Sequence, residues 1–209
     1  GAGKTTLAQQ IVFALAGRDH RALYFTVVGE PPLKMLRYQQ QFSFFDLAKV
    51  NEAVRFVNLS DDVLNGNLEK ILGRIVQEVE ATNPGVVVVD SFRTVARAAA
   101  RAENHDLDLQ HFVQQLAVRL TGWEATTFLV GEYQPSEAEH NPIFTVADGL
   151  LWLYQSVDRN SMVRKLQVMK MRGQAPIPGL HTFRITGDGI QVFPRLIVGP
   201  AQKARAAVS

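Results

Sequence analysis

The first six residues, GAGKTT, carry the second half of a nucleotide-binding pattern. A P-loop reads G-x-x-x-x-G-K-[ST], and Gly3, Lys4 and Thr5 supply its last three positions. In such a loop, backbone N–H groups and the positive end of the following helix bind phosphate. The lysine reaches the β- and γ-phosphates, and the threonine hydroxyl binds Mg²⁺. These residues are therefore candidate ligands of ATP and Mg²⁺, and so short a match needs support from the rest of the chain.

Three acidic residues could complete such a site. Asp90 ends the run VVVVD, whose β-branched residues predict a buried parallel strand. Ligands of α/β proteins bind at that end of a strand, so we expect Asp90 to serve Mg²⁺, the alternative being an N-cap of the next helix. Glu30 follows another apolar run and is expected to orient the attacking water, the alternative being an exposed turn. Glu132, at the end of FLVGE, is a second candidate near the γ-phosphate.

The elements that must position these residues alternate between strands and helices. Apolar residues recur at helical spacing directly after Thr5, as a P-loop requires. After residue 145, strand-like runs separated by turns predict antiparallel strands. The pattern predicts an α/β fold, in which a central, mostly parallel sheet flanked by helices is followed by a C-terminal antiparallel edge. Strands are expected at 22–28, 54–59, 86–90, 126–131, 149–155, 165–173, 181–186 and 190–196, and further helices at 33–40, 68–79 and 109–120.

The length and amino-acid composition of the chain are those of a single globular domain. The chain has 209 residues, of which 46% are hydrophobic, and we expect a domain over 1–196 followed by a linker or tail over 197–209. The absence of Cys excludes thiolate chemistry and fits a cytoplasmic protein. No apolar run approaches the roughly 18 residues of a membrane span, so no membrane partner is expected. The net charge is +2 with scattered basic residues, so nucleic acid is not an expected partner.

Four stretches, taken in order, resemble the KaiC-like family of the RecA-superfamily P-loop ATPases. They are GAGKTT (1–6), YFTVVGEPP (24–32), VVVVDSFR (86–93) and the C-terminal VMKMRG…GLHTFRITGDGIQVFPRL (168–196). The last stretch is the most specific, because a K-x-R-G strand followed by an F-x-I-T-x-x-G-I-x-V-F-P hairpin is characteristic of the family. The resemblance implies a RecA-like core whose first strand and first P-loop glycine lie upstream of Gly1.

The resemblance also implies an assembly and a set of site residues. Family members form rings, usually hexamers, with ATP at the subunit interfaces, so a homo-oligomer that binds ATP and Mg²⁺ is expected. Lys170 and Arg172 would reach the neighbour's ATP, where positive charge stabilises the transferring phosphoryl group; the residues alone favour a surface pair on an edge strand. The expected ATP-binding residues are Gly1, Ala2, Gly3, Lys4, Thr5, Thr6, Lys170 and Arg172, with Lys4, Glu30 and Arg172 as catalytic residues and Thr5 and Asp90 as metal ligands.

Two departures from the family pattern limit what it implies. Family members commonly carry two adjacent glutamates where this chain has Gly29 and Glu30, so we expect slow hydrolysis with Glu30 as the surviving acid. The phosphorylated Ser-Thr pair of the family's clock proteins falls in PIFTVADG, where Phe144 takes the serine position and only Thr145 could accept phosphate. Autokinase activity is therefore not expected.

The resulting hypothesis is a slow, Mg²⁺-dependent ATPase in a ring, with a regulatory or signalling role and a regulatory protein as partner. The first alternative is an ATP-gated assembly module with negligible turnover, which Gly29 favours. The second is a DNA-recombination ATPase, which the modest charge and the lack of a basic, aromatic-studded loop disfavour.

Overall fold

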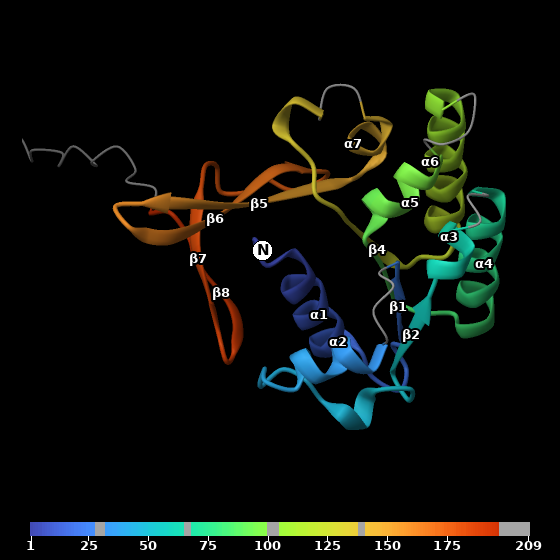
Figure 1. Ribbon diagram of the computed structural model, residues 1–209, viewed down its shortest axis with the longest axis horizontal. Coiled ribbons are helices and arrows are strands. Elements are labelled where there is room, and N and C mark those ends of the chain that lie inside the picture. The colour runs from blue at the N-terminus through green and yellow to red at the C-terminus, as the bar shows by residue number, and fades with distance from the viewer. Residues whose placement is uncertain (28–31, 65–67, 100–104, 138–140, 197–209) are drawn as a thin grey trace, which may run out of the picture.

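A computed structural model describes residues 1–27, 32–64, 68–99, 105–137 and 141–196, which form two four-stranded sheets and their helices (Figure 1). The helices are α1 (Lys4–Leu15), α2 (Pro32–Gln39), α3 (Ser60–Leu64), α4 (Leu68–Thr82), α5 (Phe92–Ala99), α6 (His105–Gly122) and α7 (Pro142–Val146). The strands are β1 (Ala22–Thr26), β2 (Val54–Asn58), β3 (Val86–Asp90), β4 (Thr126–Val130), β5 (Gly149–Asp158), β6 (Ser161–Met171), β7 (His181–Thr186) and β8 (Gly189–Phe193).

The first sheet is parallel, with the strand order β2-β1-β3-β4. All five residues of β1 are buried, as are the four valines of β3, which is why both read as continuous apolar runs. The register places Thr26 beside Asp90 and Asp90 beside Val130, so the strands end at one common edge. Residues that follow these strands are thereby brought to the same side of the sheet, where α/β proteins bind their ligands.

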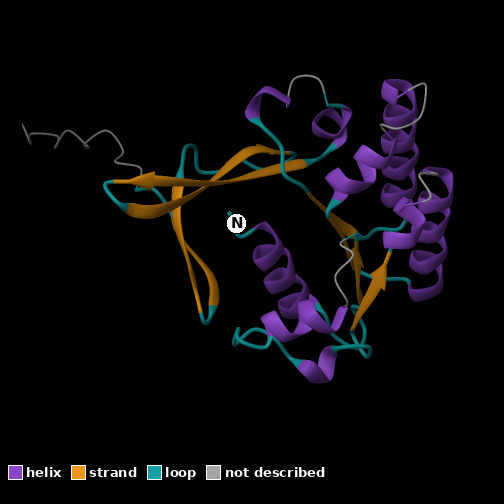
Figure 2. Cartoon of the chain, in the orientation of Figure 1, coloured by secondary structure: helices purple, strands orange, loops and turns teal. Residues whose placement is uncertain are grey.

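Helices cover both faces of the parallel sheet (Figure 2). Alternate residues of β1 divide between two apolar clusters, because successive side chains of a strand point to opposite faces. Leu23 and Phe25 pack with residues of α4, α5 and α6, whereas Tyr24 packs with residues of α1. The helix that carries the P-loop residues is thus fixed directly against the two central strands.

The four C-terminal strands form a separate antiparallel sheet in the order β5-β6-β7-β8. The strands predicted for this half are confirmed, but they do not extend the parallel sheet as an edge, because each pairs with its neighbour in the chain. Arg159 and Asn160, with φ of 47° and 62°, form the β5–β6 turn, a conformation suited to two-residue hairpins.

The second sheet meets the first half of the chain at α1 (Figure 1). The Ile190 N–H of β8 donates to Gln10 Oε1 of α1 at 2.7 Å, and Gln10 Nε2 donates to the Ile190 carbonyl at 3.4 Å. Leu7 of α1 also packs against the small apolar core of the antiparallel sheet. The P-loop helix therefore lies between the two sheets.

The predicted α/β core, with its parallel sheet, flanking helices and C-terminal antiparallel strands, is confirmed. The three later helices are present as α2, α4 and α6, the last of which begins at His105 rather than at 109. Within the described ranges, no helix is both long enough and apolar enough to cross a membrane. Gly29, Glu30 and the tail 197–209 lie outside the described residues, and the division into 1–196 and a tail stays a prediction.

Candidate functional site

The candidate phosphate site is built on the first turn of α1. Gly3 caps this helix with φ of 91° and ψ of 12°, a left-handed conformation that glycine adopts without the steric cost that other residues meet. A Cβ atom at Gly3 would lie 2.8 Å from Ile185 Cδ1, so the loop also packs closely on β7. Lys4 and Thr5 follow at once, which leaves the backbone N–H groups of the first turn available to an anion.

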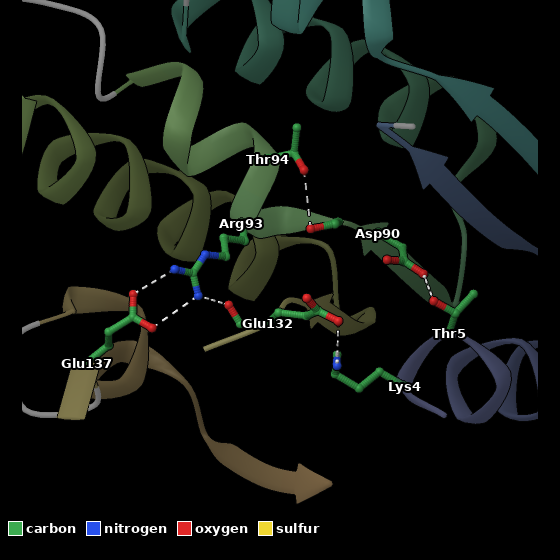
Figure 3. A network of polar contacts seen from close by, with 8 residues as sticks. Lys4, Thr5, Asp90, Arg93, Thr94, Glu132 and Glu137 are labelled. Atoms are coloured by element: carbon green, nitrogen blue, oxygen red, sulfur yellow. Dashed lines mark hydrogen bonds and ion pairs between the residues drawn. The ribbon is translucent and has the colours of Figure 1, made fainter. Parts of the chain in front are cut away.

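Thr5 and Asp90, 85 positions apart in the sequence, are joined by a hydrogen bond. The Thr5 hydroxyl donates to Asp90 Oδ2 at 2.7 Å (Figure 3). A second hydroxyl, from the buried Tyr24 of β1, donates to the same oxygen at 2.8 Å. Both partners are side chains from other elements, which favours a metal-site role for Asp90 over a cap of α5.

The surroundings of Asp90 act on its charge in opposite directions. Burial raises the pKa of its carboxyl above the ordinary value, while the hydrogen bonds from Thr5 and Tyr24 and the positive charge of Lys4 lower it. Burial also raises the pKa of Tyr24 well above its ordinary value, with the charge of Asp90 as the second cause. Tyr24 is therefore a protonated donor at neutral pH.

Lys4 lies beside the acid that follows β4. Its Nζ atom is 3.4 Å from Glu132 Oε1, with the Lys4 side chain 27% exposed and that of Glu132 81% exposed. An exposed ion pair at this distance contributes little stability, so a phosphate group can compete for the lysine. The sequence hypothesis placed Glu132 near the γ-phosphate, and the structure places it beside the lysine expected to bind that phosphate.

Arg93, the third residue after Asp90, fixes the backbone that carries Glu132. Its guanidinium contacts the Glu132 carbonyl and donates to both carboxylate oxygens of Glu137 at 3.0 and 3.1 Å (Figure 3). It also lies 5.3 Å from the centre of the Tyr133 ring. The Gln134 backbone N–H and the Arg93 side chain lower the pKa of Glu137, so the pair stays ionised. Sequence reasoning missed both Arg93 and Tyr24, although each stands inside a quoted motif.

The residues present fit a magnesium ion. A threonine hydroxyl and a carboxylate are hard oxygen donors, and Mg²⁺ is commonly held by one or two such groups together with nucleotide phosphates and water. Among the described residues, no group of three or more His, Asp or Glu side chains is arranged to hold a metal without such help. The donor set therefore suits a metal that arrives with its nucleotide.

The remaining predicted site residues lie partly at the start of α1 and partly on the antiparallel sheet, and one lies outside the described residues. Gly1 and Ala2 precede α1, and Thr6 lies in its first turn. Glu30 lies outside the described residues. Lys170 Nζ donates to the carbonyls of Thr145 and Phe144 at 3.1 and 3.5 Å, and Arg172 pairs with Asp148 at 2.7 Å. Lys170 of β6 pairs with Leu150 of β5, whereas the β6–β7 register covers only Arg164 to Leu166, and the alternative of a surface pair on an edge strand stays a prediction.

Comparisons with known proteins agree on one family. A family model described as "ATPase: KaiC" matches residues 1–197. The circadian clock oscillator protein KaiC of Picosynechococcus sp. is 26% identical over 202 residues, covering 93% of this chain and 39% of that protein. The KaiC of Rippkaea orientalis is 27% identical over 204 residues, covering 93% and 38%. The chain thus spans about two fifths of the length of these relatives.

A solved structure supports the fold. The crystal structure of a KaiC-like protein from Pyrococcus horikoshii OT3 superposes with a TM-score of 0.75 at 24% identity. The match covers 93% of this chain and 85% of that chain.

Proposed function

The chain belongs to the KaiC family of ATPases, and from this premise we propose that it binds ATP with Mg²⁺ at the start of α1 and hydrolyses the ATP slowly. One observation carries the proposal: the Thr5 hydroxyl donates to Asp90 at 2.7 Å, directly beside Lys4 and the helix N-terminus. This arrangement offers the phosphates a cation and backbone donors, and offers the metal a hydroxyl and a carboxylate.

Each residue of the site has a distinct role in this proposal. Backbone groups of Gly1, Ala2, Gly3 and Thr6 line the phosphates, and Lys4 leaves Glu132 for the β- and γ-phosphates. Mg²⁺, when bound, neutralises phosphate charge. The Thr5 oxygen can offer a lone pair to the ion while its own hydrogen still donates to Asp90, because a hydroxyl is both donor and acceptor. The bond seen between Thr5 and Asp90 is therefore compatible with metal binding.

The attacking water needs an acid to orient it. We assign this role to Glu30, with Glu132 as the second candidate because its carboxylate lies at the lysine end of the site. Positioning and electrostatics do most of the work in phosphoryl transfer, so a single acid is sufficient for slow turnover.

The family's ring assembly extends the proposal to the subunit interface. Lys170 and Arg172 would act on the ATP of a neighbouring subunit in a hexameric ring. In support, their described contacts are with α7 and Asp148, and none of these contacts reaches Lys4, Thr5 or Asp90 of the same chain. The ring would serve a regulatory or signalling role through a protein partner.

The test is a Lys4→Ala variant of the full-length protein, with Lys165→Ala as a control. The Lys165 ammonium contacts Thr182 on the antiparallel sheet and has no role in the proposed site. Lys4→Ala should weaken ATP binding about 10- to 100-fold, since it removes a charge-assisted bond worth about 1.5–3 kcal/mol. Unchanged ATP affinity in Lys4→Ala, measured by calorimetry, would reject the site.

The second candidate function is an ATP-gated assembly module with negligible turnover. Gly29 favours it, because a glutamate is common at that position in the family. Assembly on ATP addition without phosphate release over many hours would support this module over the ATPase.

A further inference from the structure

Tyr24 occupies a position where a phenylalanine would serve the apolar core equally well. It lies in the middle of β1, is 0% exposed, and packs with Val12, Val86 and Val88 on the α1 face of the sheet. A buried hydroxyl is unfavourable unless it finds a hydrogen-bond partner. Here the partner is Asp90, two residues beyond Val88, the residue that Tyr24 faces across the β1–β3 pair.

The bond uses one particular oxygen of Asp90. Tyr24 donates to Oδ2 from within the sheet, and Thr5 donates to the same Oδ2 from α1. Two donors from different directions restrict rotation of the carboxylate, and neither of them occupies Oδ1. Oδ2 of the carboxylate thus accepts both hydrogen bonds, and Oδ1 accepts neither of them.

We propose that Tyr24 is a positioning residue, whose buried hydroxyl fixes Asp90 so that Oδ1 is presented to Mg²⁺ or to its bound water. This inference rests on the proposed function and adds to it a residue that touches neither nucleotide nor metal. The carboxylate of Asp90 needs a second hydrogen-bond donor for two reasons. It is partly desolvated, and its other donor, the Thr5 hydroxyl, also has to bind the metal. A phenylalanine at position 24 would fill the core and, among the hydrogen bonds of the described residues, leave Asp90 with the one from Thr5.

The test compares Tyr24→Phe with Tyr154→Phe in the full-length protein. Tyr154 is the matched control, because its hydroxyl contacts Gln167 on the antiparallel sheet, away from Asp90. Binding of a fluorescent, non-hydrolysable ATP analogue is measured at increasing Mg²⁺ and again in EDTA. Tyr24→Phe should raise the half-saturating Mg²⁺ concentration about 10- to 100-fold, the range expected for loss of one hydrogen bond to a charged group. Binding in EDTA should change by less than about twofold.

Two outcomes would overturn the proposal. An unchanged Mg²⁺ requirement would remove any positioning role. An equal loss of binding with and without Mg²⁺ would show a general structural effect instead. The variant Asp90→Asn separates these failures from failure of the proposed function. If only Asp90→Asn raises the Mg²⁺ requirement, the proposed metal site is supported and the positioning role of Tyr24 is rejected. If neither variant changes the Mg²⁺ requirement, the proposed metal site itself is rejected. Thermal unfolding of Tyr24→Phe with and without Mg²⁺-nucleotide provides a second measurement, in which the stabilisation by metal should shrink.

Discussion

Replacing Gly3 by alanine should destabilise the domain and weaken nucleotide binding, for two separable reasons. The first is conformational, because a left-handed φ of 91° is unfavourable for an L-residue by about 1–2 kcal/mol. The second is steric, because the new methyl group would lie 2.8 Å from Ile185 Cδ1. That atom ends a flexible side chain, so the clash should add only about 1 kcal/mol, the low end for overpacking. The total loss in the free energy of unfolding is about 2–3 kcal/mol.

The two parts can be separated by a second substitution in β7. Ile185→Val removes the Cδ1 atom, and the next atom of that side chain, Cγ1, is 3.7 Å from the added methyl group, an ordinary contact. In the double variant Gly3→Ala/Ile185→Val, the steric part of the lost unfolding free energy, about 1 kcal/mol, should therefore be recovered. The conformational part of the loss should remain. Gly17→Ala is the control, because a Cβ there meets nothing within 4 Å.

Urea unfolding of the four variants and the wild type measures these differences, and calorimetry measures ATP affinity in parallel. A Gly3→Ala effect within about 0.5 kcal/mol of the Gly17→Ala effect would refute the reasoning about the loop. Equal effects of Ile185→Val in the wild-type and Gly3→Ala backgrounds would refute the close contact between the loop and β7.

Three further predictions concern the charged residues of the site. Burial raises the pKa of Asp90 in the folded state, so its contribution to stability is greatest at low pH and declines as the pH rises from the ordinary carboxyl range through the raised value. Asp90→Asn should therefore raise Tm at pH 7, with a smaller gain near pH 4, and a lowered Tm at pH 7 in thermal unfolding would contradict this sign. Arg172→Ala should reduce kcat by about 10³ if the arginine acts on a neighbour's phosphate, with unchanged thermal stability because its pair with Asp148 is exposed. Mixing Arg172→Ala with Glu30→Gln subunits should restore part of the phosphate release, and no recovery in confirmed mixed rings would show that the two residues do not meet across an interface.

Several features of the fold were predictable because they are local. Four consecutive valines before Asp90 specify a buried strand, and apolar residues between Leu68 and Val79 at helical spacing specify an amphipathic helix. The pair Gly3-Lys4 marks the start of a helix whose first turn is left open to an anion. Each signal depends on backbone preference and side-chain periodicity within a few residues, which a single sequence carries in full.

The assembly of the site depended on contacts that no local signal encodes. The sequence offered Thr5 and Asp90 as separate candidates, and only the packing of α1 across β1 and β3 brings their oxygens within 2.7 Å. In the sequence Tyr24 is one more apolar member of a strand, and Arg93 one more residue after a motif. Their roles arise from the register that aligns Tyr24 with Val88 and from the loop that brings Glu137 back to Arg93.

The sequence by itself determined the order of elements, the P-loop residues and the family, because these follow from local pattern and motif. The tertiary structure alone decided that the C-terminal strands form a sheet of their own against α1, and that two hydroxyls share one oxygen of Asp90. The physical reason is that a hydrogen bond fixes distances to a few tenths of an ångström. Distances of that kind between residues far apart in the chain are set by how whole elements pack, and not by the residues near either end of the bond.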